Sequence, residues 1–545
     1  MSGRRIDPIT LEVLRHALTA VGEEMNANLI RSAYSPNIKE RRDCSCAVFD
    51  AAGEMVTQAE TIPVHLGAMP ASVAAAMAYD GELAPGDIVV LNDPYRGGAH
   101  LPDITFVAPV HRAGELVGYV ANRAHHADVG GKEPGSLAGD SREIYQEGLR
   151  LPPVRLWKGG RVDADLRDLI LLNVRTPEER WGDLRAQFAS CQAGVRRFLE
   201  LVDRHGFGTL RDGMQEIQDY AERRMRAEIG ALSDGRFVFE DALEGDGFDE
   251  QEVPIRAEVI IDGERLTVDF AGTAAQVIGP VNAVLAVTQS AVYYAVRTMT
   301  DPTIPPSAGC YRAIHVLAPK GSVVAAVPPA PVVGGNLETS QRIVDVVLGC
   351  LGQAIPGKRV AASQGSMNNV AIGGIDPRSG RPYTIYETIA GGCGASASGD
   401  GADGVHSHMT NTLNTPVEAL ETAYPLRIVR YELAAGTGGG GRFRGGLGLR
   451  REIQVVGHAA RVSLLTERRN RSPYGVAGGE PGHMGANRLI RAAGHVSPLP
   501  SKASFEICDG ETLSIQTPGG GGYGSVDDRP AEAIERDRRE DRSRT

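Results

Sequence analysis

Histidine and aspartate gather in residues 92–131, the stretch of the sequence with the clearest capacity for chemistry. It reads NDPYRGGAHLPDITFVAPVHRAGELVGYVANRAHHADVGG. Neutral imidazole nitrogens and carboxylate oxygens are donors that divalent metals take in catalytic sites. The residue types of the stretch therefore favour a divalent-metal site. Its histidines and aspartates are His100, His111, His125, His126, Asp93, Asp103 and Asp128.

A β-hairpin is predicted to position these side chains. Two β-rich apolar runs are separated by a short segment that carries a turn-forming glycine. In an antiparallel hairpin that turns about Ala113–Gly114, a residue near Asp103 lies opposite one near His125. His100 falls just before the first run, so three ligand-type side chains gather at the open end. The two runs are Ile104–His111 and Leu116–His125.

The histidines also allow purely structural interpretations when only the pattern is considered. They could be surface residues of a hairpin, or the pair at 125 and 126 could complete a polar core. The glycine pairs at 97–98 and 130–131 permit close backbone approach and favour the metal site. A register shift of one residue moves every side chain to the other face, so the pattern does not decide between His125 and His126.

A second hairpin is predicted in residues 40–60, where the turn repeats the Ala-Gly-Glu of the first. Asp43 stands at the start of its leading strand, as Asp103 does in the other hairpin. If the two hairpins share a sheet, Asp43 is a candidate fourth metal ligand. The alternative is a salt bridge from Asp43 to Arg41 or Arg42, which the pattern alone favours.

Composition limits the class of protein. A chain of 545 residues with 42% hydrophobic and 23% charged residues is typical of a soluble globular protein with two to four domains. The net charge of −11 disfavours nucleic acid or an anionic membrane as the main partner. We expect a cytoplasmic protein, because no apolar run is long enough for a membrane span and the first residues lack an apolar signal core. The seven scattered cysteines are then reduced thiols.

The order of residue patterns predicts an α+β, multidomain fold with mixed sheets, packed helices and a glycine-rich, β-dominated C-terminal half. Helical spacing of apolar residues is found at 7–35, 176–204 and 212–232, and short strand patterns fill 235–318. The predicted regions are an N-terminal α+β metal-binding region (1–160), a helical region (161–234), a β-rich region (235–332), a glycine-rich α/β region (333–524) and a mobile charged tail (525–545).

Nucleotide-binding motifs are incomplete in this sequence. Residues 352–359 match most of a phosphate-binding loop, but Arg359 replaces the Ser or Thr that holds Mg²⁺. The segment also follows a predicted helix instead of a strand. With no dinucleotide fingerprint and no GxSxG elbow, the chain shows no credible ATP site of its own.

Longer strings of the sequence resemble the hydantoinase B/oxoprolinase family, which also includes the alpha subunits of acetone and acetophenone carboxylases. The similarity runs over residues 5–525, and none of the strings is a short generic motif. They are RRDCSCAVFD (41–50), PVHLGAMP (63–70), NDPYRGGAHLPDIT (92–105), HHADVGG (125–131), EIYQEGLRLPP (143–153), GGNLETSQRIVDVVLG (334–349), GVHSHMTNTLNTPVEALE (404–421), GRFRGGLG (441–448) and TPGGGGYG (517–524).

The resemblance implies the metal-bearing subunit of an ATP-dependent cyclic amidase for a hydantoin, 5-oxoproline or a related lactam. A hydantoinase A-type partner would bind ATP and Mg²⁺ and phosphorylate the substrate, and the two would form a hetero-oligomer that contains a homodimer. One divalent ion (Zn, Mn or Fe) would be held by His100, Asp103 and His125, with Asp43 the fourth ligand. The resemblance thus prefers His125 over His126.

Two carboxylates are candidates for proton transfer in such a reaction, Asp128 and Glu147. A structural salt bridge or a solvated loop position is the alternative for each. Two other functions also stay open. One is the alpha subunit of an ATP-dependent ketone carboxylase. The other is a non-catalytic scaffold subunit whose structural metal is closed by four protein ligands.

Overall fold

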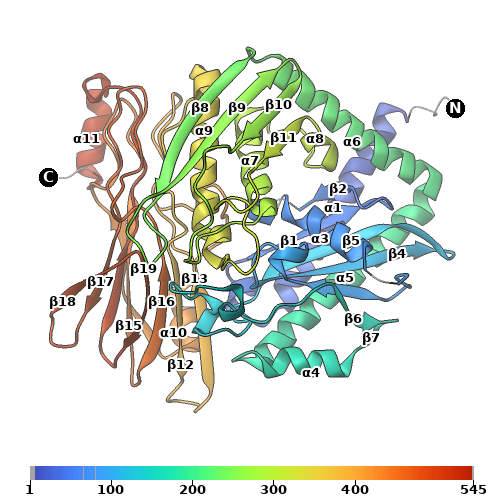
Figure 1. The fold of residues 1–545 in the computed structure, drawn as a ribbon, viewed down its shortest axis with the longest axis horizontal. Helices are drawn as coiled ribbons and strands as arrows, with labels where there is room; N and C mark the ends of the chain where they lie inside the picture. The colour runs from blue at the N-terminus through green and yellow to red at the C-terminus, as the bar shows by residue number, and fades with distance from the viewer. Residues whose placement is uncertain (1–5, 60, 66, 80, 543–545) are drawn as a thin grey trace.

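Several separate sheets with helices packed between and around them make up the computed structural model, which describes residues 6–59, 61–65, 67–79 and 81–542. The N-terminal sheet and its helices lie to the right in Figure 1, and the C-terminal sheets lie to the left. Helix α9 (Ser340–Ala354) stands between the two. The predicted α+β, multidomain fold is confirmed.

The N-terminal sheet has seven strands in the order β2-β1-β5-β4-β3-β6-β7, and every neighbouring pair is antiparallel. Both predicted hairpins belong to it, and they are joined because β1 pairs with β5. The strands are β1 (Cys44–Phe49), β2 (Met55–Gln58), β3 (Ile88–Leu91), β4 (Asp103–Arg112), β5 (Glu115–His125), β6 (Val154–Lys158) and β7 (Arg161–Val162).

The predicted hairpin is confirmed as β4–β5, and its observed register sets Asp103 opposite His125. Its turn residues, Ala113 and Gly114, have φ angles of 53° and 84°. Positive φ at both central positions is the geometry of a tight hairpin turn whose twist matches that of the strands. Residues 103–110 and 117–125 are buried without alternation, so both faces of the hairpin are covered.

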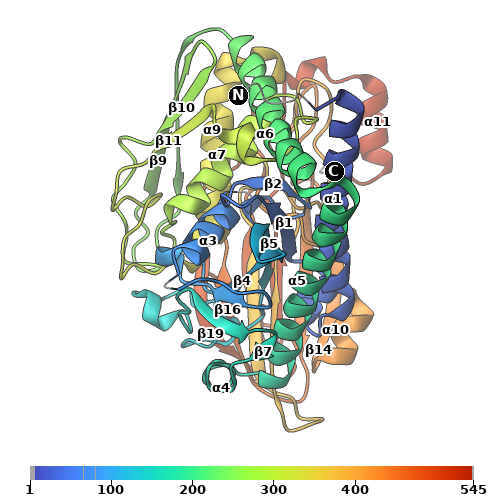
Figure 2. The same ribbon diagram turned by 90° about the vertical axis from the view of Figure 1, so that its right-hand side faces the viewer.

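Three long helices lie side by side along this part of the molecule (Figure 2): α1 (Pro8–Ser32), α5 (Pro177–His205) and α6 (Phe207–Gly230). The predicted helices are therefore confirmed within a few residues of their ends. Helix α1 begins where Asp7 accepts hydrogen bonds from the backbone N–H groups of Ile9 and Thr10, a normal N-cap. Shorter helices in this half are α2 (Pro36–Lys39), α3 (Ala68–Met77) and α4 (Ala164–Leu172).

The short strands predicted in residues 235–318 form a second sheet in the order β11-β10-β9-β8. Helix α9 packs on β8 and β9, and it is preceded by a π-helical turn, Gly335–Thr339. The elements are β8 (Gly235–Leu243), β9 (Val253–Asp262), β10 (Arg265–Asp269), β11 (Ile314–Leu317), α7 (Leu285–Met299) and α8 (Ala308–Tyr311).

Two antiparallel sheets enclose a separate core in the C-terminal half, with strand orders β13-β12-β16-β19 and β14-β15-β20-β17-β18. Residues 525–545, predicted as a mobile charged tail, include helix α11 (Ala531–Arg539), and Arg529 before it pairs with Asp400 and Asp537. The other elements are β12 (Asn369–Ile375), β13 (Pro382–Glu387), α10 (Val417–Ala423), β14 (Leu426–Ala434), β15 (Gly448–Val455), β16 (Ala460–Leu465), β17 (Ala486–Ile490), β18 (Val496–Leu499), β19 (Lys502–Ile507) and β20 (Thr512–Gln516).

Within the described residues, every helix is too short or too polar to cross a membrane.

Replacement of Gly118 by alanine should destabilise the N-terminal sheet. A Cβ at this position in β5 would lie 2.5 Å from the carbonyl oxygen of Phe49 and 2.7 Å from the ring of Phe198. Overpacking of this kind costs about 1–3 kcal/mol, so the thermal midpoint should fall. The matched control is Gly208→Ala in α6, where a Cβ meets no atom within 4 Å and should stabilise the helix by about 0.5–1 kcal/mol. An unchanged midpoint in Gly118→Ala would show that the sheet accommodates the methyl group.

Candidate metal centre

One carboxylate oxygen lies at the centre of the histidine cluster. Oδ1 of Asp103 is 3.1 Å from Nε2 of His100 and 3.2 Å from Nδ1 of His125. The ligand atoms of these three residues all lie within 4.8 Å of one another. Nitrogen and oxygen ligands at 2.0–2.2 Å from a tetrahedral ion are separated from each other by roughly 3.3 Å. The spacing therefore fits three ligands of a single metal ion.

The positions of the three side chains follow from the local fold. Asp103 is the first residue of β4 and His125 the last of β5, so the hairpin register brings them together. His100 lies in the preceding turn, whose closing hydrogen bond runs from the N–H of Asp103 to the carbonyl of His100. The turn needs a glycine at 98, because a Cβ there would lie 2.3 Å from the carbonyl oxygen of Asn92.

Burial leaves a donor atom of this cluster without a partner. His100, Asp103 and His125 are 0%, 1% and 4% exposed. Nε2 of His125 has no hydrogen-bond partner among the described residues, and Nε2 of His100 lies against Oδ1 of Asp103, the oxygen that Nδ1 of His125 also approaches. An unpaired buried polar atom costs about 1–3 kcal/mol. A cation bound by these atoms would remove that cost, which the protein without a cation retains. The residues present fit a metal ion.

The charge states of the cluster also suit a metal. Burial alone would raise the pKa of Asp103, but His100, with hydrogen bonds from His125 and His65, holds it well below its usual range. Burial lowers the pKa of His125 and so favours its neutral form. Metal binding needs an ionised carboxylate and neutral imidazoles. His100 has Nδ1 3.4 Å from the carbonyl oxygen of Val333, which favours the tautomer with a free Nε2.

Sequence reasoning missed a fourth residue at the cluster, His65. Its Nε2 is 3.5 Å from Oδ2 of Asp103, and its Nδ1 is 2.7 Å from Oγ of Ser45. His65 lies in the string PVHLGAMP, far from residues 92–131 in sequence. A histidine in a stretch shared with a family was the available signal, but no local spacing pointed to it. In the structure His65 orients the oxygen of Asp103 that faces away from the other two histidines.

The C-terminal half supplies the other wall of the centre. The ring of Tyr386, in β13, stacks on His125 with 4.4 Å between centroids and 21° between planes. The guanidinium of Arg41 lies 5.0 Å from the centroid of the same ring. The hydroxyl of Tyr386 donates to Oδ1 of Asn369 at 2.7 Å, and Nδ2 of Asn369 donates to Oε1 of Glu338 in the π-helical turn at 2.7 Å. The orientation of His125 is thus tied to residues more than 200 positions away.

Asp43 and His126 both lie beside the cluster but outside the group of three. The backbone carbonyl of Asp43 accepts a hydrogen bond from the N–H of His125 at 3.0 Å. No ion pair joins the Asp43 carboxylate to Arg41 or Arg42, which are both among the described residues. His126 points to the opposite face of the strand, where Nε2 lies 2.9 Å from Oε1 of Gln187.

Asp128, a candidate for proton transfer, is held in a structural role. Its two oxygens accept four hydrogen bonds, from the N–H groups of Gly130, Gly135 and Arg175 and from the guanidinium of Arg175 at 2.9 Å. The carboxylate has about four lone-pair positions, so all are in use. It fixes the loop that follows β5.

Glu147, the second candidate, is also fully buried. Its oxygens accept the N–H groups of Val332 and Val333 at 3.0 Å. Burial outweighs these bonds and raises the pKa of Glu147 to about 8. Val333 connects Glu147 to His100, because its N–H donates to Glu147 and its carbonyl oxygen faces the imidazole.

The seven cysteines are free thiols, as the sequence predicted. Cys44 and Cys46, on the strand beside β5, are buried, and burial raises the pKa of both thiols. Neither belongs to the group of residues that could hold an ion.

Comparison with known proteins gives the same family across the whole chain. The sequence profile described as Hydantoinase B/oxoprolinase matches residues 7–526. A putative B-type subunit of a D-/L-hydantoinase from a Pseudomonas species is 31% identical over 97% of this chain and 92% of its own length. The 5-oxoprolinase of Dictyostelium discoideum is 37% identical over 96% of this chain but only 41% of its own length. The chain therefore spans about two fifths of the length of the 5-oxoprolinases that it matches.

Solved structures give the same result. An ATP-dependent caprolactamase from Pseudomonas jessenii superposes with a TM-score of 0.92 at 33% identity, over 99% of this chain and 95% of that one. Acetone carboxylase has the same fold, with a TM-score of 0.91 at 19% identity over 98% of this chain and 78% of that one. From the profile, the relatives and the fold, this chain belongs to the hydantoinase B/oxoprolinase family.

Proposed function

We propose that this chain is the metal-bearing subunit of an ATP-dependent enzyme that hydrolyses a hydantoin, 5-oxoproline or a related lactam. A partner subunit of the hydantoinase A type would phosphorylate the substrate first. One observation carries the proposal. In a chain of this family, His100, Asp103 and His125 present buried nitrogen and oxygen atoms that all lie within 4.8 Å of one another, a spacing that suits one divalent ion.

The kind of reaction is supported by the relatives. An ATP-dependent caprolactamase matches the chain over nearly its whole length, and 5-oxoprolinases match it over a part of theirs. The Pseudomonas relative is named as one subunit of a hydantoinase, which supports a partner subunit here. An ATP-binding partner is also consistent with the incomplete phosphate-binding loop at 352–359, which lies at the end of helix α9 and not after a strand.

A metal site alone is poorly suited to hydrolyse an unactivated lactam, and ATP supplies the activation. The amide of an unactivated lactam is stabilised by resonance and has a poor amine leaving group. Phosphorylation of the carbonyl oxygen in the partner gives an imidoyl phosphate and ADP. Addition of water to the former carbonyl carbon and expulsion of the ring nitrogen give an open-chain amine and an acyl phosphate. A second water releases phosphate and the free carboxylate.

The residues of this chain would prepare the site for that water. A divalent ion held by them would act as a Lewis acid and lower the pKa of a water molecule to about 7. Asp103 supplies the negative charge, and the carbonyl of Val333 holds His100 in one tautomer. Tyr386 excludes solvent from one face of His125. We assign a positioning role to Asp128 and Glu147, because backbone donors occupy their oxygens.

Removal of any of the three ligands should lower the bound metal. His100→Ala, Asp103→Ala and His125→Ala should each reduce the metal per chain in elemental analysis, because each removes one of three donors. Loss of one ligand or of its support typically weakens metal binding by at least 10–100-fold. His126→Ala is the control, since its ring points away from the cluster. Full metal content in the folded His100→Ala variant would contradict the assignment.

Loss of the Tyr386 ring should weaken metal binding without removing a ligand. We expect Tyr386→Leu to raise the Kd for Zn²⁺ about 10–100-fold, measured by competition with a chromogenic chelator, because His125 loses its stacking partner. Tyr386→Phe keeps the ring and should weaken binding less. The control is Tyr383→Leu on the same strand, whose hydroxyl lies against His458 instead. Equal affinities in wild type and Tyr386→Leu would show that the ring does not orient His125.

The isolated chain should bind metal, fail to bind ATP and fail to hydrolyse an unactivated lactam. Addition of the hydantoinase A-type partner with ATP and Mg²⁺ should give turnover, with one phosphate released per ring opened. Each decade of rate corresponds to about 1.4 kcal/mol of barrier, and without phosphorylation water must add to a carbonyl carbon that amide resonance stabilises. ATP binding to this chain alone in calorimetry, or lactam hydrolysis without ATP, would overturn the division of labour.

A further inference from the structure

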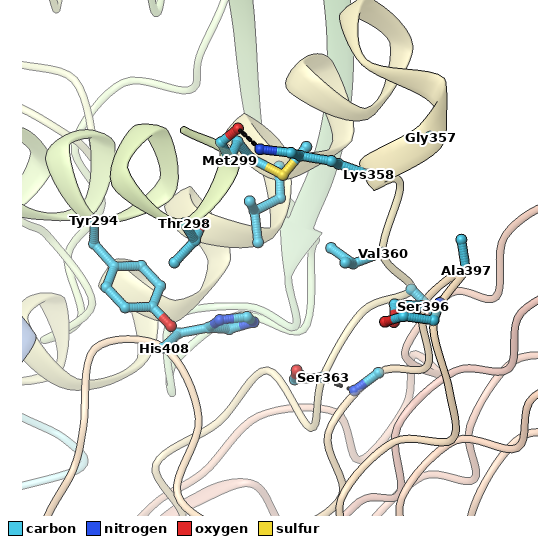
Figure 3. Close-up of a pocket in the computed structure, with 14 residues that line it drawn as sticks. Tyr294, Thr298, Met299, Gly357, Lys358, Val360, Ser363, Ser396, Ala397 and His408 are labelled. Atoms are coloured by element: carbon cyan, nitrogen blue, oxygen red, sulfur yellow. Dashed lines mark hydrogen bonds between the residues drawn. The ribbon is translucent and has the colours of Figure 1, made fainter. Parts of the chain in front are cut away.

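A second cavity lies outside the metal centre, with a volume of about 590 Å³ (Figure 3). It opens between helix α7, the C-terminal end of α9 and the segments 357–363 and 394–398. None of His100, Asp103 and His125 lines it. Ligand cavities in proteins typically have about 300–1,000 Å³, so this one is large enough for a small organic molecule.

The charged groups that line this cavity are basic. Lys358 stands at its rim, and its Nζ donates one hydrogen bond, to the carbonyl oxygen of Met299 at 2.9 Å. Within the part of the chain that the structure describes, no carboxylate lies within salt-bridge distance of Lys358, and none lines the cavity. An ammonium group has three donors, so Lys358 can offer two more to a ligand. The cavity therefore has a free positive charge at its mouth.

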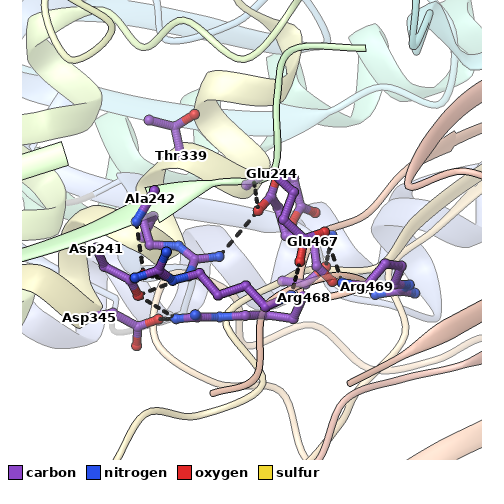
Figure 4. A network of polar contacts seen from close by, with 12 residues as sticks. Asp241, Ala242, Glu244, Thr339, Asp345, Glu467, Arg468 and Arg469 are labelled. Carbon is purple, nitrogen blue, oxygen red and sulfur yellow. Dashed lines mark hydrogen bonds and ion pairs between the residues drawn. The ribbon is translucent and has the colours of Figure 1, made fainter. Parts of the chain in front are cut away.

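His408 extends into the same space from the opposite wall (Figure 3). Its side chain is 10% exposed, and its Nε2 faces Oδ1 of Asp345 at 3.5 Å. The other oxygen of Asp345 is held by Arg468 at 2.8 Å, which also binds Asp241 (Figure 4). His408 has a φ of 54°, a left-handed backbone conformation that is uncommon outside turns and functional sites. Asp345, itself held by Arg468, thus fixes the position of the His408 imidazole.

The remaining residues that line the cavity form a hydroxyl-rich part and an apolar part. Hydroxyl groups of Ser363, Ser396 and Ser398 lie on one side, where Ser363 accepts the N–H of Gly394 and the hydroxyls of the other two are 2.8 Å apart. Apolar side chains form another part of the wall: Met299, Leu348 and Val360.

We propose that this cavity binds a small organic anion. The anionic group would lie between Lys358 and His408 and accept hydrogen bonds from the serine hydroxyls, while the apolar body would pack on Met299, Leu348 and Val360. The positive charge of Lys358, with no carboxylate among the described residues that line the cavity, favours an anion over a cation. The apolar wall is what distinguishes an organic anion from a bare inorganic one. This inference does not depend on the reaction proposed above.

Calorimetry on the full chain tests the site, with phenyl phosphate as the probe. We expect saturable binding to the wild type, weakened at least tenfold in Lys358→Met, which keeps the length of the side chain but removes its charge. Because Lys358 is exposed, this variant should fold. Lys320→Met, at another exposed lysine, is the control and should bind as the wild type does. His408→Gln should also weaken binding.

Two further probes test separately the anionic group and the apolar body of the ligand. Inorganic phosphate should bind at least tenfold more weakly than phenyl phosphate, and phenol should bind weakly and without dependence on Lys358. Absence of phenyl phosphate binding, or equal affinity in the wild type, Lys358→Met and His408→Gln, would overturn the proposal. Binding of inorganic phosphate as tight as that of phenyl phosphate would overturn the assignment to an organic anion.

Discussion

Antiparallel pairing of β4 with β5 is the constraint on which the candidate metal centre depends. Two residues directly opposite in such a pair have Cα atoms about 4.5–5.5 Å apart, which is close enough for both side chains to reach one ion. In this register the opposed residues are Asp103 and His125. A slip of one residue would place His126 opposite Asp103 and would move every side chain of β5 to the other face of the sheet. The turn at Ala113–Gly114 and the burial of both faces make such a slip costly.

Buried charges outside the metal centre require partners, and segments far apart in the sequence provide them for each other. Arg342 and Arg468 are fully buried and pair with Asp241. Arg468 also pairs with Asp345, as Figure 4 shows. Removing one member of a buried pair leaves an uncompensated charge and typically costs about 3–5 kcal/mol. These pairs join β8, helix α9 and the segment after β16. The same helix begins at the π-helical turn that carries Glu338, whose contact with Asn369 leads to Tyr386 and His125.

Local features of this site were predictable from the sequence, and long-range ones were not. Spacing of apolar residues and a glycine turn were enough to predict the hairpin and to bring a residue near Asp103 opposite one near His125, because the pairing of a short hairpin depends on neighbouring residues. His65 and Tyr386 reach the cluster from other elements, and no periodicity connects them to it. Choosing His125 over His126 needed the family resemblance. The pattern also could not tell that the oxygens of Asp128 are occupied by backbone N–H groups, since hydrogen bonding depends on how the loop folds.

The central claim is that His100, Asp103 and His125 together hold one divalent ion. Anomalous diffraction from crystals of the full chain, measured above and below the absorption edge of the metal found in it, tests this most directly. We expect one anomalous peak that contacts all three side chains, with Nε2 of His100 and Oδ1 of Asp103 among the ligand atoms. A crystal that contains metal but shows no peak at this cluster, or whose peak lies at cysteine sulfur, would contradict the account.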